Sequence, residues 1–259
     1  MTLAGFSLAA RLRAGETVYT GWCSLASPIV AEIAAREGFV AVALDGQHGL
    51  WDPEATRTGI AAIRQGGAAP IARIALEDFG GASRALDWGA EGIVAPMINN
   101  AADARRFVDA CKFPPVGERS WGPNRALQLA GIADMKLYLR EANDNVVTIA
   151  MIETQEAMDN LDAIAAVPGI DVLFVGPSDL SITLTKGAEI DPHSKVVEAA
   201  NDKVLAACKK AGKIAGLYCA TAERAVEVSK RGFRFCAVGN DFGFVRAAYA
   251  AAAKVTKAG

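Results

Sequence analysis

Short apolar runs alternate with amphipathic segments along most of the chain. Runs with few polar residues are typical of strands that are buried on both faces of a parallel sheet. We predict strands over residues 17–23, 39–44, 69–73, 91–95, 146–152, 171–175, 213–219 and 234–238. Segments with helical spacing of their apolar residues lie between them, over 27–37, 53–65, 79–88, 101–111, 154–166, 195–211, 221–231 and 240–256. Eight strand–helix units in 259 residues predict an α/β fold, the (β/α)8 or TIM barrel.

Two segments depart from this alternation. A helix over about residues 5–14 precedes the first strand, and we expect it to cap the bottom of the barrel. Residues 112–145 are too long for an ordinary helix–strand connection, and 132–142 has a helical pattern. This insertion before the fifth strand is interpreted as a surface insertion, a lid or an oligomer contact. No linker-like stretch divides the chain, so we expect a single domain over residues 1–259.

The composition excludes several classes of protein. With 52% hydrophobic residues the chain can form a large core, and a net charge of -2 without runs of like charge argues against nucleic acid or membrane partners. The five cysteines lack metal-ligand spacing, and Cys23, Cys219 and Cys236 are expected to be buried thiols in strands. No signal-like or membrane-spanning apolar stretch is evident, which predicts a cytoplasmic location.

Polar side chains follow several predicted strands at their carboxyl ends. Such residues meet at one face of a barrel even when they are distant in sequence. Taken singly, each has a structural explanation, such as a helix cap, a favourable helix dipole or a surface ion pair. Their joint occurrence favours an active site that contains Trp22, Asp45, His48, Arg73, Glu153, Ser178, Asp179 and Tyr218. His48 is the member that exchanges protons most readily near neutral pH.

The residue types at these strand ends favour metal chemistry. Glu153 and Asp179, with no histidine or cysteine ligand beside them, suit Mg²⁺ or Mn²⁺, with water and substrate oxygens completing the shell. No glycine-rich phosphate loop is present, which disfavours nucleotide and sugar-phosphate substrates. Only Lys213 touches a predicted strand, and it lies at the start of that strand, so an imine-forming lysine is not expected.

In these stretches the sequence resembles the class II, metal-dependent pyruvate aldolases. That family includes 4-hydroxy-2-oxoheptanedioate, 2-keto-3-deoxy-L-rhamnonate and 2-dehydro-3-deoxyglucarate aldolases. The similar stretches cover nearly the whole chain and are Asp45–Gly49, Arg73, Leu86–Gly89, Val94–Met97, Phe113–Gly117, Ile152–Thr154, Glu156–Ala157 and Val175–Leu180.

The resemblance implies catalytic and metal-binding roles. Glu153 and Asp179 hold a divalent cation, which is Mg²⁺, Mn²⁺ or Co²⁺. His48 acts as the general base, and Asp87 orients it and raises its basicity. Arg73 stabilises the carbonyl or enolate oxygen of the substrate.

The resemblance also implies substrate contacts and an assembly. The backbone of Ser178 and Asp179 contacts the substrate carboxylate. Independently of the resemblance, Trp22 and Tyr218 at their strand ends are interpreted either as shaping the aldehyde side or as ordinary packing at the barrel rim. Met151 stands at a substrate-contact position where the family commonly has Gln, Gln47 stands where it commonly has Glu, and Ser120–Trp121 replaces a common Gly-rich pair. The family assembles as a hexamer, a trimer of dimers, in which partners exchange the last helix and the long insertion lies near a neighbouring active site.

The resulting functional hypothesis is a reversible aldolase. It splits 4-hydroxy-2-oxo acids into pyruvate, or a close 2-oxo acid such as hydroxypyruvate, and an aldehyde, through an enolate stabilised by the metal. The alternatives are an acyl-CoA lyase of the citryl-CoA or malyl-CoA type and a non-catalytic protein that binds oxo acids. Activity on free 2-oxo acids without CoA separates the first two, and loss of activity on chelation excludes the third.

Overall fold

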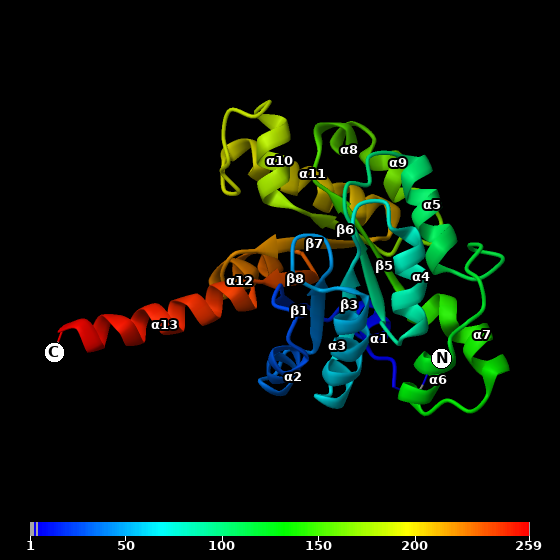
Figure 1. Ribbon diagram of the computed structural model, residues 1–259. Coiled ribbons are helices and arrows are strands. Elements are labelled where there is room, and N and C mark those ends of the chain that lie inside the picture. The colour runs from blue at the N-terminus through cyan, green and yellow to red at the C-terminus, as the bar shows by residue number, and fades with distance from the viewer. Residues whose placement is uncertain (1–2, 4, 259) are drawn as a thin grey trace.

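Eight parallel strands form a closed barrel in the computed structural model, which describes residues 3 and 5–258 (Figure 1). Residues 1, 2, 4 and 259 of the predicted domain lie outside this part of the chain. Each strand pairs with the next, and the last pairs with the first, which confirms the predicted TIM barrel. The strands are β1 (Val18–Cys23), β2 (Ala41–Asp45), β3 (Ala69–Arg73), β4 (Gly92–Ala95), β5 (Val147–Ile152), β6 (Val172–Val175), β7 (Ile214–Cys219) and β8 (Phe235–Val238).

Helices surround most of the barrel (Figure 1). Several begin at residues whose side-chain oxygens accept hydrogen bonds from first-turn N–H groups, as Ser27, Asp52 and Asp78 do. The helices are α1 (Leu8–Arg13), α2 (Pro28–Arg36), α3 (Pro53–Gln65), α4 (Phe79–Asp87), α5 (Ala101–Cys111), α6 (Asn124–Ala130), α7 (Met135–Asn145), α8 (Gln155–Asp159), α9 (Leu161–Ala165), α10 (Pro177–Leu184), α11 (Lys195–Ala211), α12 (Ala222–Arg231) and α13 (Asp241–Ala258).

Alternate side chains of each strand point into the barrel. On β2, Ala41 and Ala43 belong to the interior cluster, and on β3 Ala69 and Ile71 do so. Because the period of a strand is two residues, the next inward position on each strand is its polar end. Asp45 and Arg73 are these positions, and they are also paired in register across β2 and β3.

The amino-terminal helix closes the bottom of the barrel, as predicted. Leu8 is fully buried in the barrel-interior cluster, which Ala9 and Leu12 also join. The buried carboxylate of Glu91, at the start of β4, accepts hydrogen bonds from the N–H groups of Ser7 (2.7 Å) and Leu8 (2.9 Å). These bonds satisfy first-turn donors of α1 that have no acceptor within the helix.

The long insertion packs at the lower end of the molecule, beside α1 (Figure 1). It holds two helices, α6 and α7, whereas the sequence pattern predicted only the second. The buried Lys112 joins it to the barrel by donating to the carbonyls of Asn143 and Val146 and to the carboxylate of Asp171. No residue of 112–145 lines the main cavity of the chain's described part, so within one chain the insertion is not a lid.

Two other helical predictions need correction. The segment predicted as one helix over 154–166 is divided at Asn160 into α8 and α9. Helix α10 lies directly after β6, in a stretch where no helix was predicted. Pro177 occupies its first helical position, where the missing N–H group of proline has no consequence.

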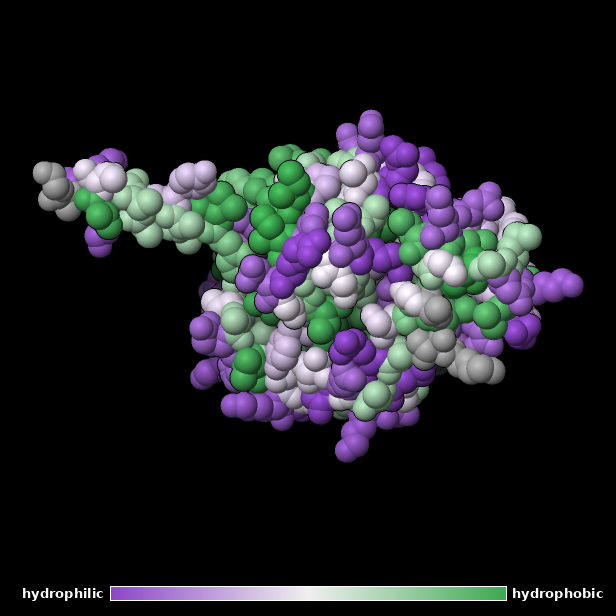
Figure 2. Space-filling model, turned by 90° about the horizontal axis from the view of Figure 1, so that it is seen from below, coloured by the Kyte–Doolittle hydropathy of each residue, from purple (hydrophilic) through white to green (hydrophobic). Residues whose placement is uncertain are grey.

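The last helix projects away from the barrel body (Figure 1). Its exposed apolar side chains are Phe242, Phe244, Val245, Tyr249 and Val255. Figure 2 shows hydrophobic residues along this projecting arm. None of the helices in the described part of the chain is long and apolar enough to span a membrane.

The five cysteines are all buried free thiols, as expected for the three in strands. Burial raises the pKa of Cys23, Cys219 and Cys236 to about 12, which keeps these thiols protonated and unreactive.

Candidate active site

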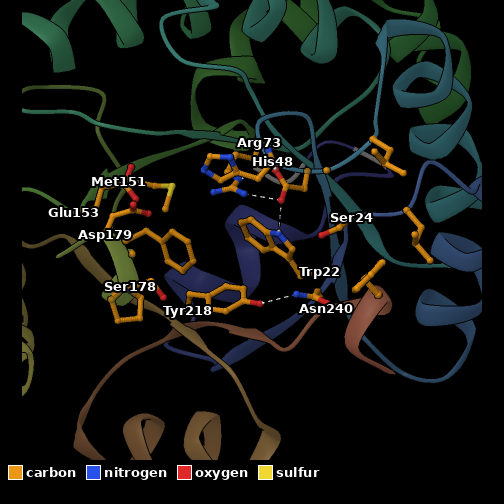
Figure 3. Close-up of a pocket in the computed structure, with 18 residues that line it drawn as sticks. Trp22, Ser24, His48, Arg73, Met151, Glu153, Ser178, Asp179, Tyr218 and Asn240 are labelled. Atoms are coloured by element: carbon orange, nitrogen blue, oxygen red, sulfur yellow. Dashed lines mark hydrogen bonds and ion pairs between the residues drawn. The ribbon is translucent and has the colours of Figure 1, made fainter. Parts of the chain in front are cut away.

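A cavity of about 490 Å³ opens at the carboxyl ends of the strands (Figure 3). Every predicted site residue except Asp87 lines it. The lining residues are Trp22, Ser24, Leu25, Asp45, His48, Gly49, Leu50, Arg73, Met151, Glu153, Phe174, Gly176, Pro177, Ser178, Asp179, Tyr218, Asn240 and Phe242.

Asp45 connects three parts of the cavity wall. Its carboxylate accepts hydrogen bonds from Arg73, from the indole N–H of Trp22 (3.1 Å) and from the backbone N–H groups of Gln47 and His48. Burial by itself raises the pKa of this carboxyl group, but the hydrogen bonds and charge of Arg73, with the hydrogen bonds of His48 and Trp22, hold the pKa below its ordinary value. Asp45 is therefore a charged anchor for the site.

Arg73 is held in a fixed orientation by that carboxylate. Its Nε and Nη2 atoms donate to the two oxygens of Asp45 at 2.8 and 2.6 Å, in the forked geometry that arginine forms with carboxylates. Its guanidinium carbon lies 5.1 Å from the ring centroid of Trp22. Since Nη1 makes no hydrogen bond to the residues described, it is available to a ligand in the cavity.

Glu153 is a buried carboxylate: one of its oxygens accepts a backbone hydrogen bond, and the other lies near the cavity. The N–H of Met97 donates to its Oε1 at 2.8 Å. Met97 adopts a left-handed backbone with φ of 55°, a conformation that costs a residue other than glycine about 1 kcal/mol or more. The surrounding structure thus imposes a strained turn that directs an N–H group at Glu153.

Gly176 makes room for the other oxygen of Glu153. A Cβ atom at Gly176 would lie 2.4 Å from Oε2, well inside contact distance. Burial raises the pKa of Glu153 to about 7; the Met97 N–H opposes this rise, and the negative charge of Asp179 adds to it. A cation between the two carboxylates would favour their charged forms and so reverse the shift.

The donor set therefore fits a hard divalent cation. Glu153 and Asp179 supply two carboxylates, and the described residues contain no cluster of three or more His, Cys, Asp or Glu side chains that could hold a metal. Mg²⁺ and Mn²⁺ commonly bind through one or two carboxylates, with water and substrate oxygens in the remaining positions.

The start of α10 supplies hydrogen-bond donors to the same cavity. Ser178 and Asp179 lie in the first turn of this helix, where N–H groups have no intrahelical acceptor. The positive end of the helix dipole adds to their attraction for an anion. This turn therefore suits the carboxylate of a small acid.

Aromatic rings form another wall of the cavity. Trp22 stacks on Phe174, with ring centroids 6.0 Å apart, and meets Tyr218 edge-on at 5.6 Å. Met151 lines the cavity beside them. This wall is largely apolar, which suits the carbon chain of a small substrate.

His48 lies at the edge of the cavity with an exposed side chain. Its backbone N–H is held by Asp45 at 3.1 Å, while its ring makes no hydrogen bond to the part of the chain that is described. The ring is thus free to reach a substrate proton, directly or through water.

Asp87 does not meet His48 within one chain. It is the last residue of α4, which returns antiparallel to the preceding strand, so its carboxylate lies near the opposite face of the barrel. There Arg119 donates to Asp87 Oδ1 at 2.7 Å, and Arg119 also lies over the ring of Phe113. Its expected role came from the family resemblance and not from a position at a strand end, since Asp87 is the last residue of a helix.

Comparisons with known proteins agree with this geometry. The HpcH/HpaI aldolase/citrate lyase family matches residues 19–248. The chain belongs to this family. It is 36% identical to a hydroxypyruvate/pyruvate aldolase of Rhizorhabdus wittichii, covering 90% of this chain and 92% of that one. It is 35% identical to a 4-hydroxy-2-oxo-heptane-1,7-dioate aldolase of Shigella flexneri, covering 96% and 92%.

The HpcH/HpaI aldolase from Desulfitobacterium hafniense shares the whole architecture. Its crystal structure superposes on this chain with a TM-score of 0.89 at 26% identity, covering 97% of each chain. This agreement confirms the family resemblance predicted from the motifs.

Sequence reasoning left two residues of this HpcH/HpaI aldolase family member without a role. Asp45 was recognised as a strand-end carboxylate, but its contacts with Arg73 and Trp22 were not predicted. The shared inward register of Asp45 and Arg73 was the signal that could have indicated the pair. Asn240 contacts Tyr218 from the start of α13, and no sequence pattern pointed to it.

Proposed function

We propose that the protein is a divalent-metal-dependent aldolase. It reversibly cleaves 4-hydroxy-2-oxo acids to an aldehyde and pyruvate, or a close 2-oxo acid such as hydroxypyruvate. The observation that carries the proposal is the convergence of two carboxylates, a forked Arg73–Asp45 pair and His48 on one cavity. The names of the similar aldolases support the same reaction.

The 2-oxo acid is bound by the start of α10, by the two carboxylates and by Arg73. The N–H groups of Ser178 and Asp179 receive the carboxylate of the 2-oxo acid, and Glu153 and Asp179 hold the cation, which would supply Lewis-acid stabilisation of charge at the 2-oxo group. Arg73 donates Nη1 to the carbonyl oxygen. Because Asp45 already fixes its guanidinium, little reorganisation is needed as negative charge develops on that oxygen.

His48 moves the proton. In cleavage its ring accepts the proton of the C4 hydroxyl group, directly or through one water, and the C3–C4 bond breaks to leave the enolate of the 2-oxo acid. In the reverse direction His48 returns the proton to the new alkoxide. The two residues Asp87 and His48 lie at opposite faces of one barrel. In this proposal, the Asp87 side chain that orients His48 therefore belongs to a neighbouring copy of the chain.

The alternative acyl-CoA lyase is less well supported. His48 and Arg73 are the basic residues among those that line the cavity, and Arg73 is already paired with Asp45. No further positive group is present there for the phosphates of CoA. A non-catalytic role leaves the buried Glu153 beside Asp179 without an explanation.

We also propose that the protein is a homo-oligomer, a hexamer by resemblance to its family. The apolar side chains of α13 are exposed in a single chain and suit burial against a second copy.

The deciding experiment measures aldol addition and cleavage with free 2-oxo acids and several aldehydes, without CoA. We expect turnover that chelation by EDTA abolishes and Mg²⁺, Mn²⁺ or Co²⁺ restores, and exchange of the pyruvate methyl protons with solvent, followed by NMR. Glu153→Gln should lose metal-dependent turnover and weaken Mn²⁺ binding, measured separately by calorimetry. Unchanged turnover in EDTA, or a strict requirement for CoA, would falsify the proposal.

A further inference from the structure

The cavity has a charged end and a neutral end. In Figure 3 the ionisable groups His48, Arg73, Glu153 and Asp179 lie above Tyr218 and Asn240, and Asp45 is hydrogen-bonded to Arg73. The phenol oxygen of Tyr218 points away from Glu153 toward Asn240. The proposed function occupies the charged end and leaves the polar groups of the neutral end unassigned.

The hydrogen bonds of Asn240 determine the direction of the bond to Tyr218. The N–H of Gly243, in the first turn of α13, donates to Asn240 Oδ1 at 2.8 Å. A backbone N–H can only donate, so the amide oxygen must face Gly243 and the amide nitrogen must face Tyr218, 3.3 Å from its hydroxyl oxygen. That nitrogen can only donate, so the tyrosine oxygen is the acceptor.

The hydroxyl hydrogen of Tyr218 is therefore not used in this bond. No residue of the described chain accepts it, and the ring lines the cavity. Trp22 holds the ring edge-on at a centroid distance of 5.6 Å. Burial raises the pKa of Tyr218, so the group stays protonated and remains a donor at neutral pH.

We propose that Tyr218, oriented by Asn240, donates a hydrogen bond to a hydroxyl group of the aldehyde substrate and thereby selects hydroxyaldehydes over unsubstituted alkyl aldehydes. This inference rests on the proposed aldolase function and specifies its second substrate. A neutral hydroxyl group fits better than a carboxylate or phosphate, because Arg73, the one arginine that lines the cavity among the described residues, is already paired with Asp45. Asn240 is a positioning residue that acts through Tyr218.

The test compares glycolaldehyde with propanal, in which a methyl group replaces the hydroxyl group. The readout is the ratio of their kcat/KM values, with pyruvate saturating and Mn²⁺ present. Because both aldehydes share every other step, the ratio cancels losses that are common to them. Loss of one neutral hydrogen bond should lower the ratio about threefold to tenfold in Tyr218→Phe.

Asn240→Asp is the sharper variant. Aspartate caps a helix as well as asparagine does, so α13 keeps its first turn. It exchanges the amide donor for a carboxylate acceptor, so the Tyr218 hydroxyl now donates to residue 240 and is withdrawn from the cavity. We expect the same fall in the ratio, and little further fall when Tyr218→Phe is added.

Tyr19→Phe is the matched control. It removes the same atom from a tyrosine whose hydroxyl donates to Ser229 outside the cavity, and it should leave the ratio unchanged. A wild-type ratio in Tyr218→Phe would overturn the inference, and a wild-type ratio in Asn240→Asp would overturn the part assigned to Asn240. Failure of the aldolase function itself is distinguishable, because the wild-type protein would then exchange no pyruvate methyl protons.

Discussion

At the scale of single residues, Asp45 determines how the charged end of the cavity is arranged. It is 2% exposed, and the 9% exposed Arg73 contributes both of its hydrogen bonds to it. Removing one partner of such a buried ion pair is strongly destabilising, because the other partner is left as a buried charge with no opposite charge beside it. The pair therefore links the stability of the barrel rim to the orientation of Arg73, the group proposed to stabilise the enolate oxygen.

The Asp45→Asn variant should show a defined pH dependence of stability. We expect a loss of about 3 kcal/mol in the free energy of unfolding at neutral pH. The pKa of Asp45 is lowered in the folded state, so its stabilisation is complete above the unfolded aspartate pKa of about 3.9 and is lost as the pH falls through the folded-state pKa.

Urea unfolding of both proteins at a series of pH values measures this effect. The difference between them should be constant near neutrality and should shrink below about pH 4. Asp162→Asn is the control, since it breaks an exposed ion pair with Lys210 and should cost less than about 1 kcal/mol. A difference that grows on acidification would contradict the assigned pKa direction.

At the scale of elements, the turn between β6 and α10 sets the position of the proposed metal ligands. Gly176 lies where this turn passes Glu153, and Asp179 follows in the first turn of the helix. Glu153 itself follows β5, so two neighbouring strands and one helix bring the carboxylates together.

Gly176→Ala should weaken metal binding without unfolding the protein. Its φ of −95° is accessible to alanine, but the added Cβ would lie 2.4 Å from Glu153 Oε2 and must displace that carboxylate. We expect the dissociation constant for Mn²⁺ to rise about tenfold or more, the scale found when groups that orient metal ligands are altered.

Calorimetric titration of Mn²⁺ measures this change directly. Gly80→Ala is the matched control, because its Cβ would meet nothing nearer than Asp78 Oδ1 at 3.9 Å. Equal Mn²⁺ affinity in both variants and the wild type would mean that Glu153 is not a ligand.

At the scale of the whole molecule, α13 is the helix whose apolar side chains remain exposed in a single chain. It projects from the barrel with Phe242 at 58% and Tyr249 at 74% exposure (Figure 1). Large exposed apolar side chains along one helix are typical of an interface.

Tyr249→Asp should dissociate the proposed oligomer. In an isolated chain the change is at the surface and should alter stability by less than about 0.5 kcal/mol. In an interface it buries an unpaired charge, which should raise the dissociation constant of the assembly more than about tenfold. Sedimentation velocity compares it with Lys254→Asp in the same helix, which should leave the assembly intact. A wild-type protein that sediments as a monomer would show the oligomer prediction to be wrong.

The sequence by itself determined the barrel and half of the residues that line its cavity. Buried parallel strands leave an apolar signature, and their period of two dictates that Asp45 and Arg73 point inward at the rim. Strand ends of a barrel converge whatever the intervening sequence, so the positions of Trp22, His48, Glu153 and Tyr218 along the chain were enough to assign them to one site.

Only the tertiary structure decided which side chains contact one another and where the short helices form. Within one chain it placed Asp87 against Arg119, and it connected Asn240 to Tyr218. Hydrogen bonds between residues distant in sequence depend on positions of a few tenths of an ångström, which hydrophobic periodicity does not encode. Helix α10 also escaped prediction, because its eight residues are short for a periodic signal and it packs against α8 and α11, which are distant along the chain or follow a turn.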